Sequence, residues 1–187
     1  MAVRSVSDSG QPQVPLQIPK LVTDPVASLK PWPINIRVGT ETVAIPAMPA
    51  VDWLDQLMRL DDSLFLDDIF PGLLPEQDYD RVMDAYFSEK ITPQDMETIA
   101  LGAIESAAGR PWWVALRMIS VVRTNWDAVG GEFALRGVNP NHLSLAGWLD
   151  AATVLVIRGI GDNNKINQFF IRLEKPPPGH VVEEPTV

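Results

Sequence analysis

Between residues 49 and 174 the apolar side chains recur at the spacing of an α-helix, and proline, glycine and small polar residues divide this stretch into short segments. The segment 92–109 is the clearest. Thr92 and Asp95 have the spacing of a capping box, Pro93 suits a first helical turn, and Gly109 suits a helix end. A chain of 187 residues is long enough for one domain with a hydrophobic core. We therefore predict a mainly α fold, a compact multi-helix bundle.

One short stretch departs from the helical pattern. Residues 34–45 read INIRVGTETVAI and alternate apolar with polar side chains on either side of Gly39-Thr40. This alternation predicts a small N-terminal β-hairpin at 34–46 with a tight turn at its centre. Because an isolated hairpin is marginally stable, we expect it to dock on helices or to join a partner's sheet.

Both ends of the chain are rich in proline. Residues 1–33 contain six prolines, which remove hydrogen-bond donors and fix φ, so we predict an extended proline-rich arm there. Such an arm is either disordered or lies across a neighbouring subunit, and the residues favour neither reading. Residues 34–175 then form a single helical domain, and residues 176–187 a flexible tail.

Two adjacent tryptophans raise the question of what their helix contacts. In GRPWWVALRMI (109–119), successive side chains point about 100° apart on a helix, so Trp112 and Trp113 cannot both enter one narrow seam. We expect this helix to be buried on two sides, with one of the two indoles in contact with a partner, and we assign Trp126 and Trp148 to the core. Partner contact is predicted for Trp53, Leu57, Phe70, Trp112, Trp113 and Arg117.

The other helical segments carry more local expectations. Residues 75–90 predict a helix whose apolar stripe ends at Phe87, and Pro71-Gly72 should end the short helix before it. Asp162 or Asn163 should cap the last helix.

The residue types needed for catalysis are scarce. Cysteine is absent, which excludes disulfides and thiolate chemistry, and the two histidines are His142, expected at the surface, and His180, in the tail. No metalloprotease, nucleotide-binding or calcium-loop spacing occurs, and the pairs Asp61-Asp62 and Asp67-Asp68 most simply form a solvated acidic face. We predict no catalytic, cofactor-binding or metal-ligating residue, and hence no enzyme.

The charge distribution limits the partners. The net charge of −9 disfavours duplex DNA, and no apolar run approaches the roughly 18 residues of a membrane span. Residues 1–108 carry 7 basic and 17 acidic side chains, whereas residues 109–175 carry 8 basic and 5 acidic. Opposite charges of the two parts either attract each other, within the chain or between copies, or simply form solvated faces.

Three blocks of sequence resemble one protein family. They are IPAMPAVDWLDQLM with LDDIFPGLL (45–74), GRPWWVALRMI with NWDAVGGEFALRGVNPNHLSLAGWLDA (109–151), and FFIRLEKPPPG (169–179). The blocks lie between residues 45 and 179 and together cover less than half of the chain. The set resembles the tail assembly chaperones of long-tailed (siphovirus-type) bacteriophages of actinobacteria.

The resemblance implies a mostly helical, non-enzymatic late protein that acts in the bacterial host cytoplasm during infection. Its implied role is to bind the tape measure protein, keep it soluble and recruit tail tube subunits. Members of the family occur as a short form and a longer form made by ribosomal frameshifting, and Lys175–Gly179 (KPPPG) lies where such a shift would fall. The long proline-rich arm departs from the family picture and suits the alternative of a structural virion protein in the tail, connector or capsid. Assembly into homo-oligomers is compatible with either role.

Overall fold

In the computed structural model, which describes residues 30–38, 41–58, 70–178 and 180, the chain is mainly helical and carries one antiparallel hairpin. The predicted fold class is therefore confirmed. The strands are β1 (Ile34–Val38) and β2 (Glu41–Ile45). The helices are α1 (Ala50–Leu57), α2 (Phe70–Leu73), α3 (Glu76–Phe87), α4 (Pro93–Ala108), α5 (Trp112–Thr124), α6 (Trp126–Leu135), the 3-10 helix η3 (Pro140–His142), α7 (Leu145–Ile160) and α8 (Asn163–Glu174).

Local capping chemistry sets the bounds of the long helices. At α4 the Thr92 hydroxyl accepts from the Asp95 N–H at 3.2 Å while an Asp95 carboxylate oxygen accepts from the Thr92 N–H at 2.7 Å, which confirms the predicted capping box. The helix ends at Gly109, whose φ of +62° is strained for any residue with a Cβ. Ser144 caps α7, and Asp162 caps α8 as predicted.

The hairpin buries one face against helices. In its register Ile34 pairs with Ile45 and Ile36 with Val43, so the apolar side chains share one face. That face packs mainly on α4, while α3 contacts β2. The prediction of a hairpin is confirmed, although Gly39 and Thr40 lie outside the described residues. Helices of the same chain thus supply the cover that the hairpin needs.

Helix α7 is the central helix of the part of the molecule that α5, α6, α7 and α8 form. It contacts α1, α4, α5, α6 and α8, and Trp148 in its second turn is fully buried. The indole of Trp148 meets the ring of Phe133 edge to face at 5.7 Å. These contacts confirm that Trp148 belongs to the core.

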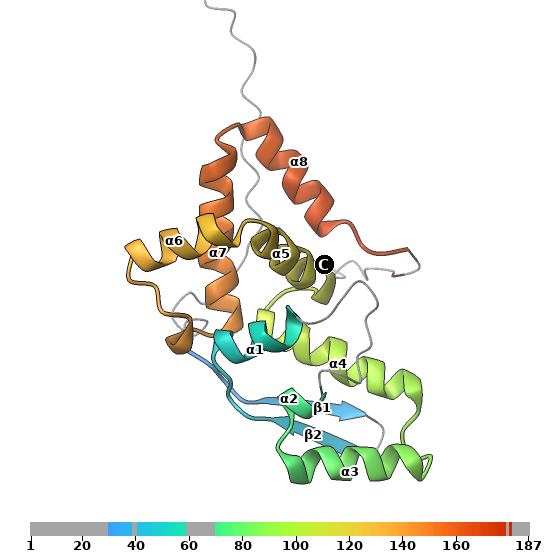
Figure 1. The fold of residues 1–187 in the computed structure, drawn as a ribbon. Coiled ribbons are helices and arrows are strands. Elements are labelled where there is room, and N and C mark those ends of the chain that lie inside the picture. Colours follow the sequence, from blue (N-terminus) through green and yellow to red (C-terminus); the bar gives the residue numbers. More distant parts are fainter. Residues whose placement is uncertain (1–29, 39–40, 59–69, 179, 181–187) are drawn as a thin grey trace, which may run out of the picture.

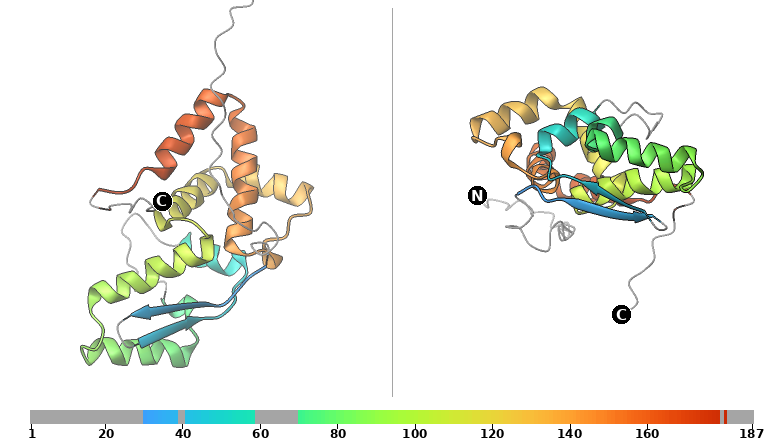
Figure 2. Two further views of the ribbon diagram at one scale, coloured as in Figure 1. Left: turned by 180° about the vertical axis from the view of Figure 1, so that it is seen from behind. Right: turned by 90° about the horizontal axis from the view of Figure 1, so that it is seen from below.

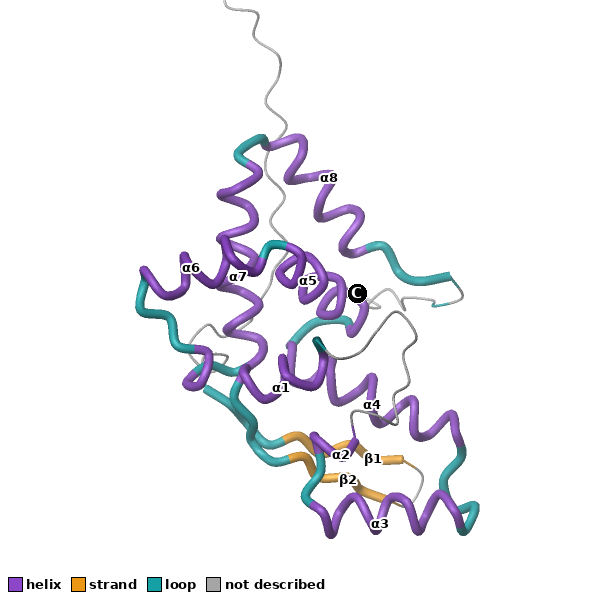
Figure 3. Tube along the Cα trace, viewed as in Figure 1, coloured by secondary structure: helices purple, strands orange, loops and turns teal. Residues whose placement is uncertain are grey.

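The elements are arranged in two groups: a lower group of β1, β2, α2, α3 and α4, and an upper group of α5, α6, α7 and α8. Figure 1 shows the hairpin with α3 and α4 at the opposite end of the molecule from α8, and α1 between the two groups. The view from behind in Figure 2 shows α7 and α8 meeting at a sharp turn, and Figure 3 shows that helices form the upper group without a strand. Segments 121–136 and 155–169, distant along the chain, thereby come to lie together.

Two predictions about the acidic half need correction. Pro71 and Gly72 lie inside the short helix α2 and do not end a helix, because proline fits a first helical turn; the residues before Phe70, where the preceding helix was expected, lie outside the described residues. Gly72 packs closely on α1, and a Cβ there would lie 2.1 Å from the Gln56 side chain. On α3 Val82 is buried, and Tyr79, Met83 and Tyr86 pack against the core, as the predicted stripe requires. Phe87, in the last turn, is 75% exposed, so the stripe reaches the core except at its last position.

Candidate partner-binding surfaces

Three of the residues predicted to contact a partner are buried within the domain. Trp53 and Leu57 on α1 and Phe70 on α2 are each no more than 3% exposed. In this conformation they present no surface to another protein, and they contribute to the core between the hairpin and α7. The sequence signal that singled them out, large apolar residues at helical spacing, is the same for a core and for an interface.

The other three predicted residues, all on α5, lie beside the end of the last helix. Arg117 Nη1 donates to the carbonyl oxygens of Arg172 and Leu173, both at 3.0 Å, and to that of Lys175. These carbonyls have no partner within α8 because they lie in its last turn or beyond it. The guanidinium of Arg117 therefore caps the C-terminus of α8, where a positive charge also favours the helix dipole.

The paired tryptophans face the residues that follow α8. Trp113 is 6% exposed, and its indole Nε1 donates to the Glu174 carbonyl oxygen at 3.2 Å. The two indoles meet edge to face at 5.8 Å, and the imidazole of His180 lies 4.7 Å from Trp113 and 6.4 Å from Trp112, between ring centroids. The described part of the predicted tail, residues 176–178 and 180, thus lies near the start of α5, where His180 contacts both rings.

The N-terminus of α5 is held by the preceding helix. The Trp112 N–H donates to the Glu105 carboxylate at 3.2 Å, which places a negative charge at the start of α5. Trp112 itself is only half-buried and packs on the edge of the core. Of the two indoles, Trp112 therefore offers the more accessible ring.

Trp126 is not a core residue, contrary to the prediction. It begins α6, and 44% of its surface is exposed. Helix α5 ends at Thr124 and the chain turns at Asn125, so Trp126 does not continue the buried face of α5. The change of direction carries the Trp126 ring to the outside of the upper group.

A groove of about 700 Å³ lies among the helices of the upper group. Its apolar walls come from Val121, Val129, Leu155, Val156, Ile160 and Phe169, which belong to α5, α6, α7 and α8. Glu132, Arg136 and Arg158 stand among the polar residues that line it, and Glu132 pairs with Arg136 at 3.0 Å. The groove thus combines a hydrophobic interior with a net positive set of charged side chains. No sequence motif marked it, because four separate segments form it.

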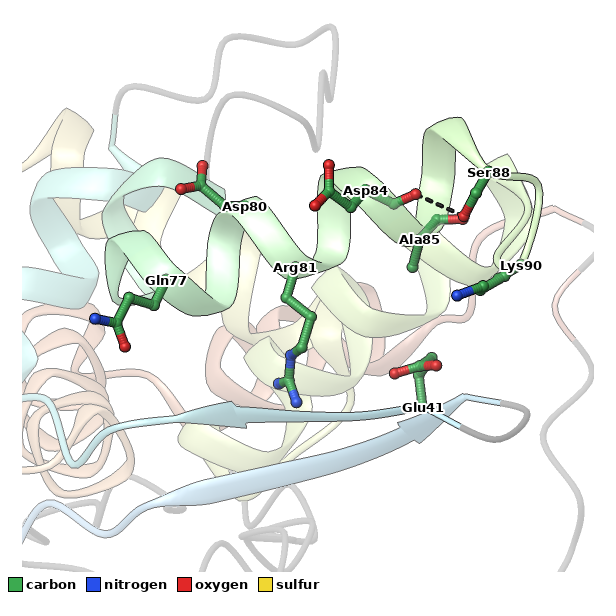
Figure 4. Close-up of a pocket in the computed structure, with 8 residues that line it drawn as sticks. All are labelled: Glu41, Gln77, Asp80, Arg81, Asp84, Ala85, Ser88 and Lys90. Atoms are coloured by element: carbon green, nitrogen blue, oxygen red, sulfur yellow. Dashed lines mark hydrogen bonds between the residues drawn. The ribbon is translucent and has the colours of Figure 1, made fainter.

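A second cavity, of about 750 Å³, is polar and lies between β2 and α3. Figure 4 shows Arg81 pointing from α3 toward β2 and the Ser88 hydroxyl turned back to its own helix. Arg81 donates to the Thr42 carbonyl at 3.1 Å and to Asp78 at 2.9 Å, and the Ser88 hydroxyl donates to the Asp84 carbonyl at 2.7 Å. Arg81 thus links α3 to β2, and the Ser88 hydroxyl is bonded within its own helix.

One ion pair ties the loop before α5 to α7. Arg110 is 8% exposed; its Nη2 donates to Asp150 at 2.5 Å and its Nε donates to the Ala108 carbonyl at 3.1 Å. Burial raises the pKa of the Asp150 carboxyl, and the charge of Arg110 and its hydrogen bond partly oppose that rise. The positive charge of Arg110 thus partly offsets the free-energy cost of burying the Asp150 carboxylate.

The structure brings no catalytic set together among the residues it describes. His142 is exposed at the end of η3, and the imidazole of His180 contacts the rings of Trp112 and Trp113. Within residues 30–38, 41–58, 70–178 and 180, no group of three or more histidine, aspartate or glutamate side chains is placed to hold a metal ion. The predicted acidic pairs Asp61-Asp62 and Asp67-Asp68 lie outside this range.

Comparison with models of protein families, with curated proteins and with solved structures finds no match. In the described part of the chain, no helix has both the length and the hydropathy required to cross a membrane.

Proposed function

We propose that this protein is a non-enzymatic tail assembly chaperone of a long-tailed bacteriophage, which holds an amphipathic helical segment of the tape measure protein in the groove between α5, α6, α7 and α8. The observation that carries the proposal is the groove itself. It joins apolar side chains of four helices in an opening of about 700 Å³. The family assignment adds the identity of the partner and derives from the sequence resemblance.

The dimensions and chemistry of the groove suit a helix. Helix-in-groove recognition uses apolar anchors at i, i+3 or i+4, and i+7 on the bound helix. Helix α6, one wall of the groove, has ten residues, which corresponds to about 15 Å or nearly three turns of a bound helix. The two arginines and one glutamate that line the groove favour acidic side chains beside those anchors.

Covering such stripes would keep a long helical partner soluble. An unassembled helical rod with exposed apolar stripes associates with itself, and a bound domain with excess negative charge suppresses that association. The net charge of −9 supplies this repulsion. Release needs no nucleotide in this mechanism, because tail tube subunits that bind the tape measure protein compete for the same surface.

Co-expression with the tape measure protein tests the proposal. Val156 lines the groove and is half-buried, whereas Val154, on the same helix, is 46% exposed and does not line it. We expect Val156→Glu to abolish co-purification and return the tape measure protein to the pellet, while Val154→Glu leaves both unchanged. A charge-reversal pair supplies a check that spares the core: Arg158→Glu in the groove should weaken binding, and the exposed Arg123→Glu should not. Equal behaviour of both pairs would refute the groove as the binding site.

The sequence of the N-terminal arm supports a structural virion protein as the second candidate. Proline-rich extended arms suit subunits that lace neighbouring copies together, and residues 1–33 have this composition. Quantitative mass spectrometry of purified virions separates the two roles. Stoichiometric presence supports the structural protein, whereas absence from virions with abundance in infected cells supports the chaperone.

A further inference from the structure

Helix α3 presents an apolar ridge with carboxylates beside it. Phe87, its last residue, is 75% exposed, and Met83 one turn earlier is partly exposed. Asp80 and Asp84 are exposed as well, and Figure 4 shows their carboxylates pointing away from β2. Helical spacing places these four positions within about 100° of one another around α3. We call Asp80, Met83, Asp84 and Phe87 the α3 ridge.

The charges of the groove are opposite to those of the ridge. Arg136 and Arg158 line the groove and are exposed, and Glu132 is the one acidic residue there. Glu132 pairs with Arg136 at 3.0 Å, whereas Arg158 forms no ion pair with another residue of the described part of the chain. A negative ridge thus meets a net positive groove, and such complementarity speeds association and fixes the register of two surfaces.

The ridge also matches the apolar interior and the length of the groove. Met83 and Phe87 have the i, i+4 spacing with which a bound helix places its anchors. Helix α3 has 12 residues, or about 18 Å, and the groove wall α6 has 10 residues, or about 15 Å. Because Phe87 stands at the C-terminus of α3, the negative end of the helix dipole would approach the arginines with it.

A ridge and a groove on the same chain cannot meet in this fold. Figure 1 shows α3 at the end of the molecule opposite the helices of the upper group, which form the groove. Acidic side chains are in excess in residues 1–108 and basic ones in residues 109–175. Two copies placed head to tail therefore bring opposite charges together, which makes a second copy the occupant that the charge distribution favours.

We propose that the α3 ridge of one copy of this chain binds the groove of a second copy, with Phe87 as the anchor. The inference rests on the proposed function in one respect, that the groove binds a helix, and it does not require that helix to be the tape measure protein. The contact joins two different surfaces, so association continues head to tail until a ring closes. The ridge supplies two anchors, whereas a long amphipathic helix supplies three or more and displaces it. Self-association then covers the groove until the tape measure protein binds.

Sedimentation velocity of the full chain over a concentration series tests the contact. We expect reversible association of the wild type that weakens with added salt, since salt screens the charges. Phe87→Glu should raise the dissociation constant at least about tenfold, because it removes the anchor and adds a negative charge. The control is Ile171→Glu on α8: Ile171 is 69% exposed and does not line the groove, so this variant should associate like the wild type.

Mixing two variants tests the pairing of ridge with groove. Phe87→Glu keeps the groove, and Arg158→Glu keeps the ridge, so each alone should associate weakly while their mixture forms a 1:1 complex. A charge reversal tests the same pairing without changing Phe87. Asp80→Lys combined with Asp84→Lys should associate weakly alone and bind Arg158→Glu more tightly than it binds itself. The inference is overturned if neither mixture associates more than its separate components.

Two further results overturn the inference. One is a wild type that stays monomeric from micromolar to millimolar concentration, and the other is equal association of Phe87→Glu and Ile171→Glu, because another surface then joins the copies. Failure here is distinct from failure of the proposed function. If Phe87→Glu associates like the wild type while Val156→Glu loses the tape measure protein, the ridge contact is rejected and the proposed function stands. If the ridge variants behave as expected while Val156→Glu retains the tape measure protein, the proposed function is rejected and the ridge contact stands.

Discussion

At the scale of single residues, adjacent identical side chains have different environments. Trp112 and Trp113 differ by about 100° around α5, and the structure buries Trp113 while leaving Trp112 half-buried. The sequence predicts that the two must differ, because one seam cannot hold both. It does not predict which is buried, because that depends on α8 and the residues that follow it, about 60 residues away.

The difference predicts unequal effects of truncation. Trp113→Ala removes a buried ring and a hydrogen bond to α8, and we expect it to lower the free energy of unfolding by about 3–5 kcal/mol, as core tryptophan truncation does. Trp112→Ala removes a half-buried ring and should cost clearly less. Urea denaturation of both variants measures the difference, with Trp148→Phe in the centre of the core as a reference. Equal losses for Trp112→Ala and Trp113→Ala would contradict the structure.

Asp150 predicts a pH dependence of stability. Burial raises the pKa of its carboxyl, so the folded protein binds a proton at Asp150 more tightly than the unfolded chain does, where aspartate titrates at about 3.9. Its contribution to the free energy of unfolding is therefore full below that value and declines as the pH rises through the folded-state pKa. Asp150→Asn removes this titration. The stability of the wild type relative to Asp150→Asn should fall across this window and become constant above it, as measured by denaturation at a series of pH values.

At the scale of elements, capping signals predicted helix bounds better than apolar stripes predicted buried faces. The capping box at Thr92 and the glycine end at Gly109 are local chemistry, which a sequence displays in full. Which strip of a helix is buried depends on neighbours from elsewhere in the chain. The exposure of Phe87 and Trp126 shows this limit, because each stands at the end of a helix where the chain changes direction.

The capping box can be tested directly. Thr92→Ala should destabilise the protein by about 1 kcal/mol, since the hydroxyl no longer accepts from the Asp95 N–H. Hydrogen bonds from the backbone and side chain of Thr92 lower the pKa of Asp95, so the variant, which keeps only the backbone donor, should show a higher Asp95 pKa by NMR titration. Because the lowered pKa stabilises the folded state above the ordinary aspartate value and that gain is lost as the pH falls, the variant should be less sensitive to acid. Thr98→Ala, on the exposed face of α4, is the matched control.

At the scale of the whole molecule, the groove could not be predicted from the sequence. Its walls come from four helices that are joined only by tertiary packing, and none of its apolar residues differs in type from those of the core. What the sequence did indicate is an apolar helix surface larger than a single seam. The structure distributes that surface among the core, the groove and the face of α5 that meets the end of α8.

Helix α8 should behave as a separate unit of stability, because its attachment is concentrated at α5. Its buried residues are Ile166, Phe170 and Leu173, and Arg117 holds its C-terminal carbonyls. Arg117→Met keeps the aliphatic stem but removes these hydrogen bonds, at an expected cost of about 1–2 kcal/mol. By hydrogen–deuterium exchange, the amides of the second half of α8 should exchange roughly tenfold faster, whereas those around Ile99 in α4 should not change. Since α8 contributes Phe169 to the groove, the same variant should bind the tape measure protein more weakly. Uniform acceleration in all helices would show instead that α8 unfolds only with the whole domain, and that Arg117 stabilises the fold globally.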